Sequence, residues 1–263
     1  MGSIRLYFRF LMVSLRVQTQ YPASFILYAL SNFSVSIIEL FGVYAMFKRF
    51  KRLGEWSFSE VMIFYGMTYM AFALAEAYMR GFDTVDRHIR SGEFDRILMR
   101  PRSTFLQVLG LEFQLLRIGR FINGLLPFIA GVIIVKPGWN PYEWALVLFS
   151  IAAGSLTYGG LMLMRAFASF FTVEALEIFN IFTHGGVSLS AYPMNIYTGW
   201  LRKLFTYVIP LAAINYWPMA LLLHKDYAPA WVSCLAPCLG MLFFAVGMVF
   251  WEIGVRHYRS TGS

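Results

Sequence analysis

Long stretches without a charged residue constrain this chain more than any other feature. The uncharged segments of at least 15 residues are 17–38, 61–75, 121–135, 144–164, 178–201, 204–224 and 227–251. A membrane-spanning helix needs roughly 20 mostly apolar residues, and one tolerated charge extends each of the first three segments: Glu39, Glu76 and Arg120. Hydrophobic residues make up 59% of the chain, against about 45–50% in soluble domains. The sequence therefore predicts an all-α polytopic membrane protein, with one domain over 1–263.

Basic residues at the two ends of the chain decide between six and seven spans. These residues are Arg5, Arg9, Arg16, Arg256 and Arg259. Because arginine and lysine concentrate on the cytoplasmic side of membrane proteins, both termini are expected in the cytoplasm. An even number of crossings follows. We expect six transmembrane helices, with segment 204–224 not crossing because Pro210 and Pro218 break it. A kinked seventh span remains the alternative.

Residues 192–224 combine an apolar composition with features that a plain membrane helix avoids. The stretch "YPMNIYTGWLRKLFTYVIPLAAINYWP" contains three prolines, two asparagines and the pair Arg202 and Lys203. Backbone groups freed by proline at membrane depth must be buried against protein or face water. We therefore expect external re-entrant helices that act as a gate. The candidate gate residues are Tyr192, Pro193, Asn215 and Tyr216.

The amino-terminal segment 1–20 predicts a different kind of helix. At 100° per residue, Arg5, Arg9 and Arg16 fall within about 40° of one another, and the other faces are apolar. This pattern is typical of an interfacial amphipathic helix that lies along the membrane surface. The net charge of +8 needs no nucleic acid as a partner, because basic loops that face anionic membrane lipid explain it.

The loop between the second and third spans mixes charges of both signs with apolar side chains. Gly92 and Pro101 favour helix ends, so residues 82–100 are expected to form a short cytoplasmic helix and a further turn. Such a surface suits docking into a groove of another protein, although a solvated loop is the alternative. The candidate docking residues are Asp83, Arg87, Arg90, Glu93, Phe94, Asp95 and Leu98.

Two carboxylates lie inside the predicted spans. An ionised side chain at the membrane centre costs about 2.5–3.5 kcal/mol on insertion scales. Glu39 is therefore expected to face protein, a partner or a water-filled path, and a structural ion pair with a helix of the partner fits it at least as well as substrate contact does. Glu76, near the inner end of the second span, is a further candidate for the path. Arg120 is expected to extend towards the cytoplasmic interface. The same carboxylates would serve an autonomous ion-coupled carrier.

The sequence offers little for catalysis or metal binding. There is no G-x-x-x-x-G-K-[ST] motif for nucleotide phosphates and no convincing nucleophile with its base. Cys234 and Cys238 have no nearby histidine or carboxylate in the sequence, so they predict packing rather than a metal site. We therefore expect a chain that is not an enzyme and holds no metal.

Four segments resemble the permeases of type-2 ATP-binding-cassette (ABC) transporters, within a bacterial exporter subfamily. They are "GEWSFSEVMIFYG" (54–66), "RSGEFDRILMRPRS" (90–103), "YPMNIYTGWLRKLFTYVIPLAAINYWP" (192–218) and "RHYRSTGS" (256–263). The resemblance implies six spans, a coupling helix at 82–100 that inserts into an ATPase, and re-entrant gate helices at 192–224.

The resemblance also implies partners and a location. It implies a bacterial inner-membrane subunit of an ATP-driven exporter that forms the path with a second permease, a heterodimer being favoured. Separate ATPase subunits would bind ATP and magnesium, so this chain would carry no cofactor. The resemblance names no substrate. It also does not account for the basic cluster "KRFKR" (48–52), which lies on the predicted external side.

Overall fold

The computed structural model describes residues 12, 22–50, 52–112, 117–172, 175–197, 199–225 and 227–259. Within these ranges every named element is helical, which confirms the all-α prediction. The long helices are α2 (Pro22–Phe50), α3 (Phe58–Asp83), α7 (Arg117–Val135), α8 (Pro141–Ser169) and α13 (Ala230–His257). The expected interfacial helix at 1–20 lies outside the described residues, except for Met12.

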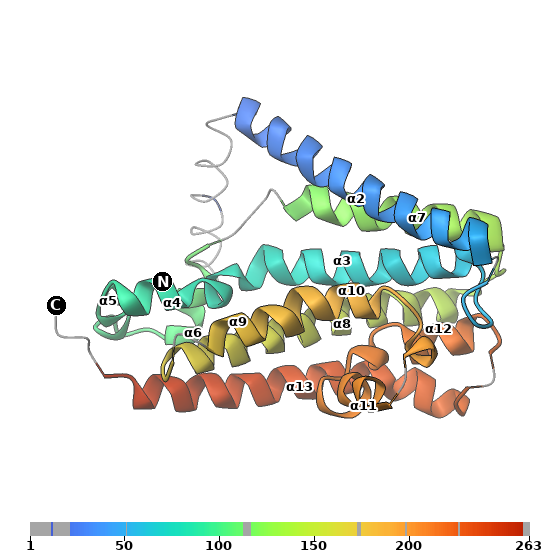
Figure 1. Ribbon diagram of the computed structural model, residues 1–263. Coiled ribbons are helices and arrows are strands. Elements are labelled where there is room, and N and C mark those ends of the chain that lie inside the picture. The colour runs from blue at the N-terminus through green and yellow to red at the C-terminus, as the bar shows by residue number, and fades with distance from the viewer. Residues whose placement is uncertain are drawn as a thin grey trace.

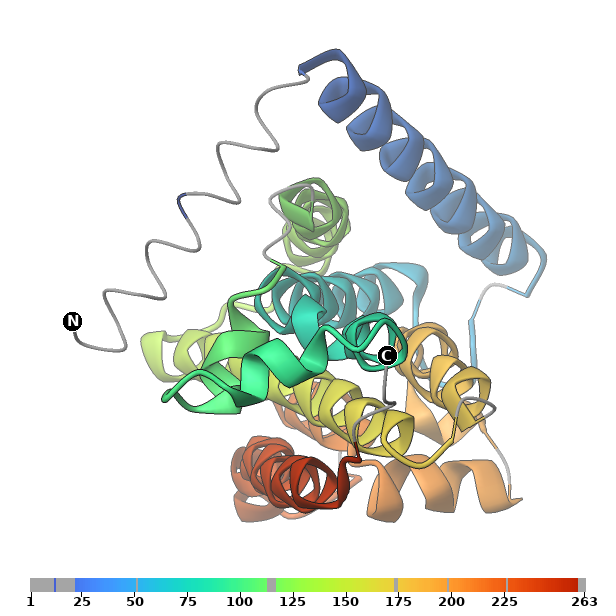
Figure 2. The ribbon, with the colours of Figure 1, turned by 90° about the vertical axis from the view of Figure 1, so that its left-hand side faces the viewer.

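The long helices form a bundle in which α3 and α8 are central. Helix α3 packs between α7 and α8, α8 also packs against α13, and α2 contacts α7 and α3 (Figure 1). Viewed along the bundle, α2 lies at its margin beside α7 (Figure 2). A helix built from α9 (Ala175–Asn180), a π-helical turn (Ile181–Gly185) and α10 (Gly186–Ser190) contacts α8 and α3.

Helices α3 and α8 each begin with a capping box, a reciprocal pair of hydrogen bonds between the residue before the helix and the third helical residue. The Ser57 hydroxyl accepts a hydrogen bond from the Glu60 amide, and the Glu60 carboxylate accepts one from the Ser57 amide at 2.7 Å. Asn140 and Glu143 repeat this arrangement at the start of α8, where Pro141 occupies the first turn. Each box satisfies backbone donors that a helix start otherwise leaves unpaired.

The short helices gather at opposite ends of the bundle (Figure 1). One end holds α4 (Val85–Arg90), α5 (Phe94–Leu98) and α6 (Thr104–Leu109), beside the last turns of α13. α12 (Tyr216–Leu222) and the loop before α3 lie towards the other end, and α11 (Gly199–Lys203) is in the same half. The bundle therefore has two ends of different construction.

The described helices support membrane insertion without establishing the number of crossings. By length and composition, three are long and apolar enough to span a membrane: Phe58–Arg90, Pro141–Ser169 and Ala230–His257. A fourth span results if Gly199–Val208 and Leu211–Leu222 are counted together. Helix Gly119–Val135 is apolar but shorter. The count of six therefore stays a prediction.

Residues 192–224 form several short helical pieces, as the prolines indicated. A 3-10 turn (Met194–Ile196) and α11 lead into a π-helical turn (Leu204–Val208), and a second 3-10 turn (Leu211–Ala213) leads into α12. The chain bends by 70° between Val208 and Leu211, where Pro210 interrupts the helix. This bend fits both a re-entrant segment and a broken span, so the two interpretations remain open.

Glycine allows α3 and α7 to approach each other closely. A Cβ atom added at Gly66 would lie 2.6 Å from the Gly124 carbonyl oxygen, and one added at Gly124 would lie 2.9 Å from the Gly66 carbonyl oxygen. Both separations are below van der Waals contact, and the obstacles are backbone atoms that cannot rotate away. Small residues at such crossings are typical of helix packing in membranes.

We predict that Gly66→Ala lowers the thermal stability of the purified protein, because the added methyl group forces α3 and α7 apart. Overpacking of this kind costs about 1–3 kcal/mol. The matched control is Gly185→Ala, whose new Cβ would lie no closer than 3.8 Å to Ile181. The measurement is the apparent melting temperature in detergent, followed by size-exclusion chromatography. Equal melting temperatures for the two variants would contradict the prediction.

Candidate functional site

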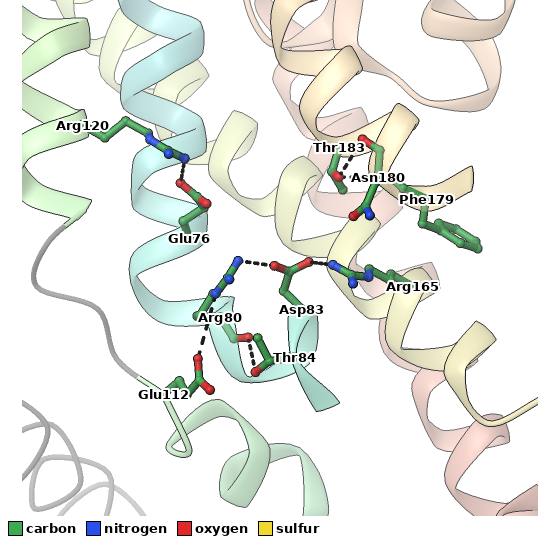
Figure 3. Close-up of polar contacts among 10 residues, drawn as sticks. All are labelled: Glu76, Arg80, Asp83, Thr84, Glu112, Arg120, Arg165, Phe179, Asn180 and Thr183. Carbon is green, nitrogen blue, oxygen red and sulfur yellow. Dashed lines mark hydrogen bonds and ion pairs between the residues drawn. The ribbon is translucent and has the colours of Figure 1, made fainter. Parts of the chain in front are cut away.

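Asp83 lies at the centre of an ionic cluster where α3 meets α4 (Figure 3). Its side chain is 6% exposed, and each carboxylate oxygen pairs with a different arginine, Arg80 on α3 and Arg165 on α8. Glu112 lies 3.9 Å from the Arg80 guanidinium. A buried carboxylate requires such compensation, because desolvation of an unpaired charge costs several kcal/mol. The cluster therefore ties the end of α3 to α8, just before α4 begins.

A second ion pair joins α3 to α7. Glu76 is 1% exposed and pairs with Arg120 (Figure 3). The expectation that Arg120 extends to the membrane interface is wrong, because its guanidinium turns towards this buried carboxylate. The sequence predicts Glu76 only as a candidate path residue, and the structure places it in an ion pair within this chain. This pairing weakens the case for Glu76 as a proton or ion carrier.

Helices α4 and α5 present an apolar inner face to the bundle. Val85, Ile89, Phe94 and Ile97 are buried there. The Phe94 ring packs edge-on against Phe170 at the end of α8 and against Tyr258 after α13, with ring centroids 5.3 and 5.0 Å apart. Between the helices, Gly92 adopts a φ of 72°, which glycine tolerates best. The chain therefore reverses sharply at Gly92, with both inner faces held against α8 and α13.

The outer face of the same segment carries most of the charged docking candidates. Arg87, Arg90 and Glu93 are exposed, and so is Leu98. Pairs Arg90–Asp86 at 3.5 Å and His88–Glu93 at 2.9 Å lie along this face. Phe94 and Asp83 do not lie on the outer face: Phe94 is fully buried, and Asp83 belongs to the ionic cluster. Aromatic packing and ion pairing turn both side chains inward in this chain, and their part in coupling to an ATPase stays a prediction.

Met99, which the sequence analysis left out, is the most exposed large apolar residue of this end at 77%. It follows Leu98, so the two form a small apolar patch among charges. Gln107 donates hydrogen bonds to the backbone oxygens of Ile97 and Arg102, at 3.0 and 3.1 Å. The patch therefore lies on a segment whose backbone is anchored from within.

Asp95 faces the carboxyl-terminal residues. The pKa of Tyr258 is raised above its ordinary value, first by burial and then by the nearby Asp95 carboxylate. Tyr258 follows the last turn of α13, and its ring packs against Phe94. Asp95 thus lies close to the residue that follows α13, a position for which the sequence carried no signal.

The gate candidates lie towards the other end of the bundle. Asn215 is fully buried, and its amide donates hydrogen bonds to the Thr68 hydroxyl at 2.6 Å and to the Ser190 carbonyl oxygen. The Tyr158 hydroxyl lies 2.6 Å from the Ser190 hydroxyl. Asn215 therefore joins the chain before α12 to α3 and α10. Pro193 is also buried.

Tyr192 lines a cavity of about 290 Å³ between α2, α3 and α10. Two stacked tyrosines of α3, Tyr65 and Tyr69, form part of its wall, with ring centroids 4.1 Å apart. From α2 come Gly42, Val43 and Met46. Helical spacing places position 39 on the same face of α2, although the side chain of Glu39 lies outside the described part. No described lining residue carries a formal charge.

Tyr216 lines a separate cavity. It is buried and stacks on Tyr227, with ring centroids 5.8 Å apart. Arg202 and Lys203 contribute to the same cavity, whose volume is about 570 Å³. Within the described ranges, no group of three or more His, Cys, Asp or Glu side chains is arranged to hold a metal ion.

Arg165 is the important site residue that sequence reasoning missed. The signal was present, since Arg165 directly follows the uncharged segment 144–164 and Asp83 follows the segment 61–75 with its extension. Opposite charges at the same depth of two predicted spans suggest a partnership. The sequence does not say which helices are neighbours, and that information was needed to pair them.

We predict that Glu76→Gln and Arg120→Gln each destabilise the protein, and that the double variant is less destabilised than the sum of the two. Breaking a buried ion pair by removing one partner costs about 3–5 kcal/mol, because the other charge stays buried. A double-mutant cycle on apparent melting temperatures in detergent measures this coupling. Strict additivity of the two effects would show that the pair contributes no coupling.

Comparison with known proteins shows to which family this chain belongs. The model of the family described as "ABC-2 family transporter protein" matches residues 33–262, which include the ionic cluster, α4, α5 and both cavities. No match was found among curated proteins or among solved structures. The family match confirms the resemblance seen in the sequence, and the apolar helices agree with a multi-pass membrane subunit. The chain therefore belongs to the ABC-2 family of transporter proteins, as a type-2 ABC transporter permease.

Proposed function

We propose that this permease is the membrane subunit of an ATP-driven exporter and that the outer face of α4 and α5 docks on a separate ATPase. The observation that carries the proposal is the two-sided construction of this segment. Its inner face is buried against α8 and α13, and its outer face exposes charges of both signs with Leu98 and Met99. A rigid, amphipathic projection of this kind suits a groove on a partner.

The inner contacts support mechanical coupling. Phe94 packs on residues after α8 and α13, and Asp83 pairs with Arg165 of α8. A force on the outer face of α5 would therefore reach α3, α8 and α13 through packed rings and ion pairs, without a flexible element between them. Nucleotide binding in the ATPase would move this segment and, with it, the membrane helices.

We also propose an orientation in the membrane and the partner subunits of this permease. The end with α4, α5 and α6 would face the cytoplasm together with both termini, in a bacterial inner membrane with six crossings. Residues 192–224 would then form the external gate. A second permease, different from this one, would complete the path beside the tyrosine-lined cavity of α2, α3 and α10. ATP and magnesium would bind to the ATPase subunits.

The first experiment is purification of the tagged chain from its native membrane in mild detergent. Mass spectrometry identifies the co-purified proteins, and an ATPase assay tests for activity in the complex. We expect an ATPase with a Walker motif and a second permease subunit. Recovery of the chain alone, without ATPase activity, would contradict the proposal and favour the ion-coupled carrier, for which Glu39 would be the residue to test.

We predict that Leu98→Glu/Met99→Glu weakens ATPase association about tenfold or more, since charged groups would replace the apolar patch at the centre of the docking face. The measurement is the amount of ATPase that co-purifies with the tagged chain. The melting temperature should change little because both side chains are exposed.

A matched control comes from the other end of the bundle. Tyr142 is 86% exposed near the start of α8, and Tyr142→Glu should leave ATPase association unchanged. Phe94→Ala serves as a contrast, because removal of a buried ring costs about 3–5 kcal/mol and should lower stability before it lowers docking. Undiminished association in the Leu98 and Met99 double variant would refute this docking face.

A further inference from the structure

The cavity beside α11 and α12 is lined by cationic, hydroxyl and apolar groups whose role the proposed ATP-driven export does not explain. Its lining comes from α11, the π-helical turn after it, α12 and the residues that lead into α13. The lining residues are Gly199, Arg202, Lys203, Thr206, Tyr207, Tyr216, Trp217, Tyr227, Ala228, Pro229 and Val232. Its volume of about 570 Å³ falls in the range of small-molecule sites.

The formal charges in the described lining of this cavity are all positive. Arg202 and Lys203 are both exposed, and neither forms an ion pair with any described carboxylate. No described lining residue is acidic. Two acidic groups in the described part of the chain that contact Tyr227 and Lys225 have partners there: Glu55 accepts a hydrogen bond from the Tyr227 hydroxyl, and Glu60 pairs with Lys225 at 3.4 Å. The two cations are therefore available to an anion from outside the chain.

The other groups that line the cavity favour a phosphate over a carboxylate as the bound anion. The hydroxyls of Thr206, Tyr207 and Tyr216 can donate hydrogen bonds. A guanidinium donates through a planar fork and an ammonium acts as a point charge, and together they suit the several oxygens of a phosphate better than one carboxylate. Ala228, Pro229 and Val232 form an apolar wall beside them.

The aromatic surroundings indicate the depth at which the ligand would lie. Tyr207 lines the cavity and is 79% exposed. Trp200 and Trp231, which adjoin the lining residues Gly199 and Val232 in the sequence, are 73% and 68% exposed. Tryptophan and tyrosine collect at the membrane–water interface, where lipid head groups lie. A ligand held here would therefore place a charged group at head-group level and an apolar part beside the membrane.

We propose that this cavity binds the phosphate-bearing head group of an anionic amphiphile. Arg202 and Lys203 contact the phosphate, the hydroxyls of Thr206 and Tyr216 complete its hydrogen bonds, and the apolar wall contacts the first carbons of the ligand. The amphiphile is a bilayer phospholipid or an exported compound with the same head-group chemistry. Binding itself does not depend on the proposed coupling to an ATPase.

The test is a titration of the purified protein with three probes: dihexanoyl phosphatidylglycerol, dihexanoyl phosphatidylcholine and inorganic phosphate. Native mass spectrometry measures the bound fraction. We expect phosphatidylglycerol to bind more tightly than either of the others. Equal affinity for the two lipids would overturn the role of the cations, and equal affinity for phosphatidylglycerol and inorganic phosphate would overturn the amphiphile.

Variants locate the binding. Arg202→Gln/Lys203→Gln should weaken phosphatidylglycerol binding about tenfold or more, the effect of losing charge-assisted hydrogen bonds. Arg100→Gln/Arg102→Gln removes two exposed arginines from the opposite end and should leave binding unchanged. If the first double variant does not fold, Lys203→Gln alone tests the site. Unchanged binding in a folded Lys203→Gln or double variant would refute the site.

A comparison of two preparations separates a lipid from an exported compound as the source. The protein purified from native membrane is extracted with organic solvent, and the bound phosphate compounds are identified by mass spectrometry. A phospholipid or another phosphate-bearing amphiphile that is present in wild type and depleted in Arg202→Gln/Lys203→Gln supports the site. Equal recovery from both preparations would count against it. ATPase co-purification in the same samples reports separately on the proposed coupling.

Discussion

The buried Asp83 carboxylate is the constraint on which the proposed coupling depends. It lies where the long helix α3 ends and α4 begins, and it has arginine partners on α3 and α8. Moving the end of α3 away from α8 would leave charges unpaired in a poorly hydrated place, which costs several kcal/mol. The ion pair between Asp83 and Arg165 therefore joins α3 to α8 directly before the proposed docking segment.

Aromatic packing strengthens the same end of the bundle from the other side. Phe94 is surrounded by Phe170, Trp251 and Tyr258, so α5 is held by the ends of both α8 and α13. A buried amide contributes hydrogen bonds at the opposite end of the bundle. There, short helices broken at prolines are joined to α3 and α10 by the buried amide of Asn215. One end is thus suited to transmit force, whereas the other has many backbone junctions at which a local rearrangement can occur.

The sequence predicted part of what depends on local chemistry. The prolines of 192–224 indicated the broken helices. The starts of α3 and α8 were not predicted, although their capping boxes at Ser57 and Asn140 also depend on local chemistry. The sequence did not predict which helices are neighbours. The partners of Glu76 and Asp83 come from other helices, and Phe94 is buried because three distant aromatic residues converge on it. A charge in an apolar segment shows that a partner is needed, but only the packing identifies that partner.

The distribution of paired and unpaired charges gives the two ends different chemical roles. At the proposed cytoplasmic end, Asp83 and Arg165 neutralise each other inside the protein. Towards the other end, Arg202 and Lys203 remain unpaired among the described residues, in a cavity whose described lining has no carboxylate. In the six-span orientation these cations lie outside, against the usual preference of arginine and lysine for the cytoplasmic side. Both cations are exposed, and they share this cavity with the tyrosines Tyr207, Tyr216 and Tyr227. An anionic ligand accounts for the unpaired charge, the aromatic wall and the position together.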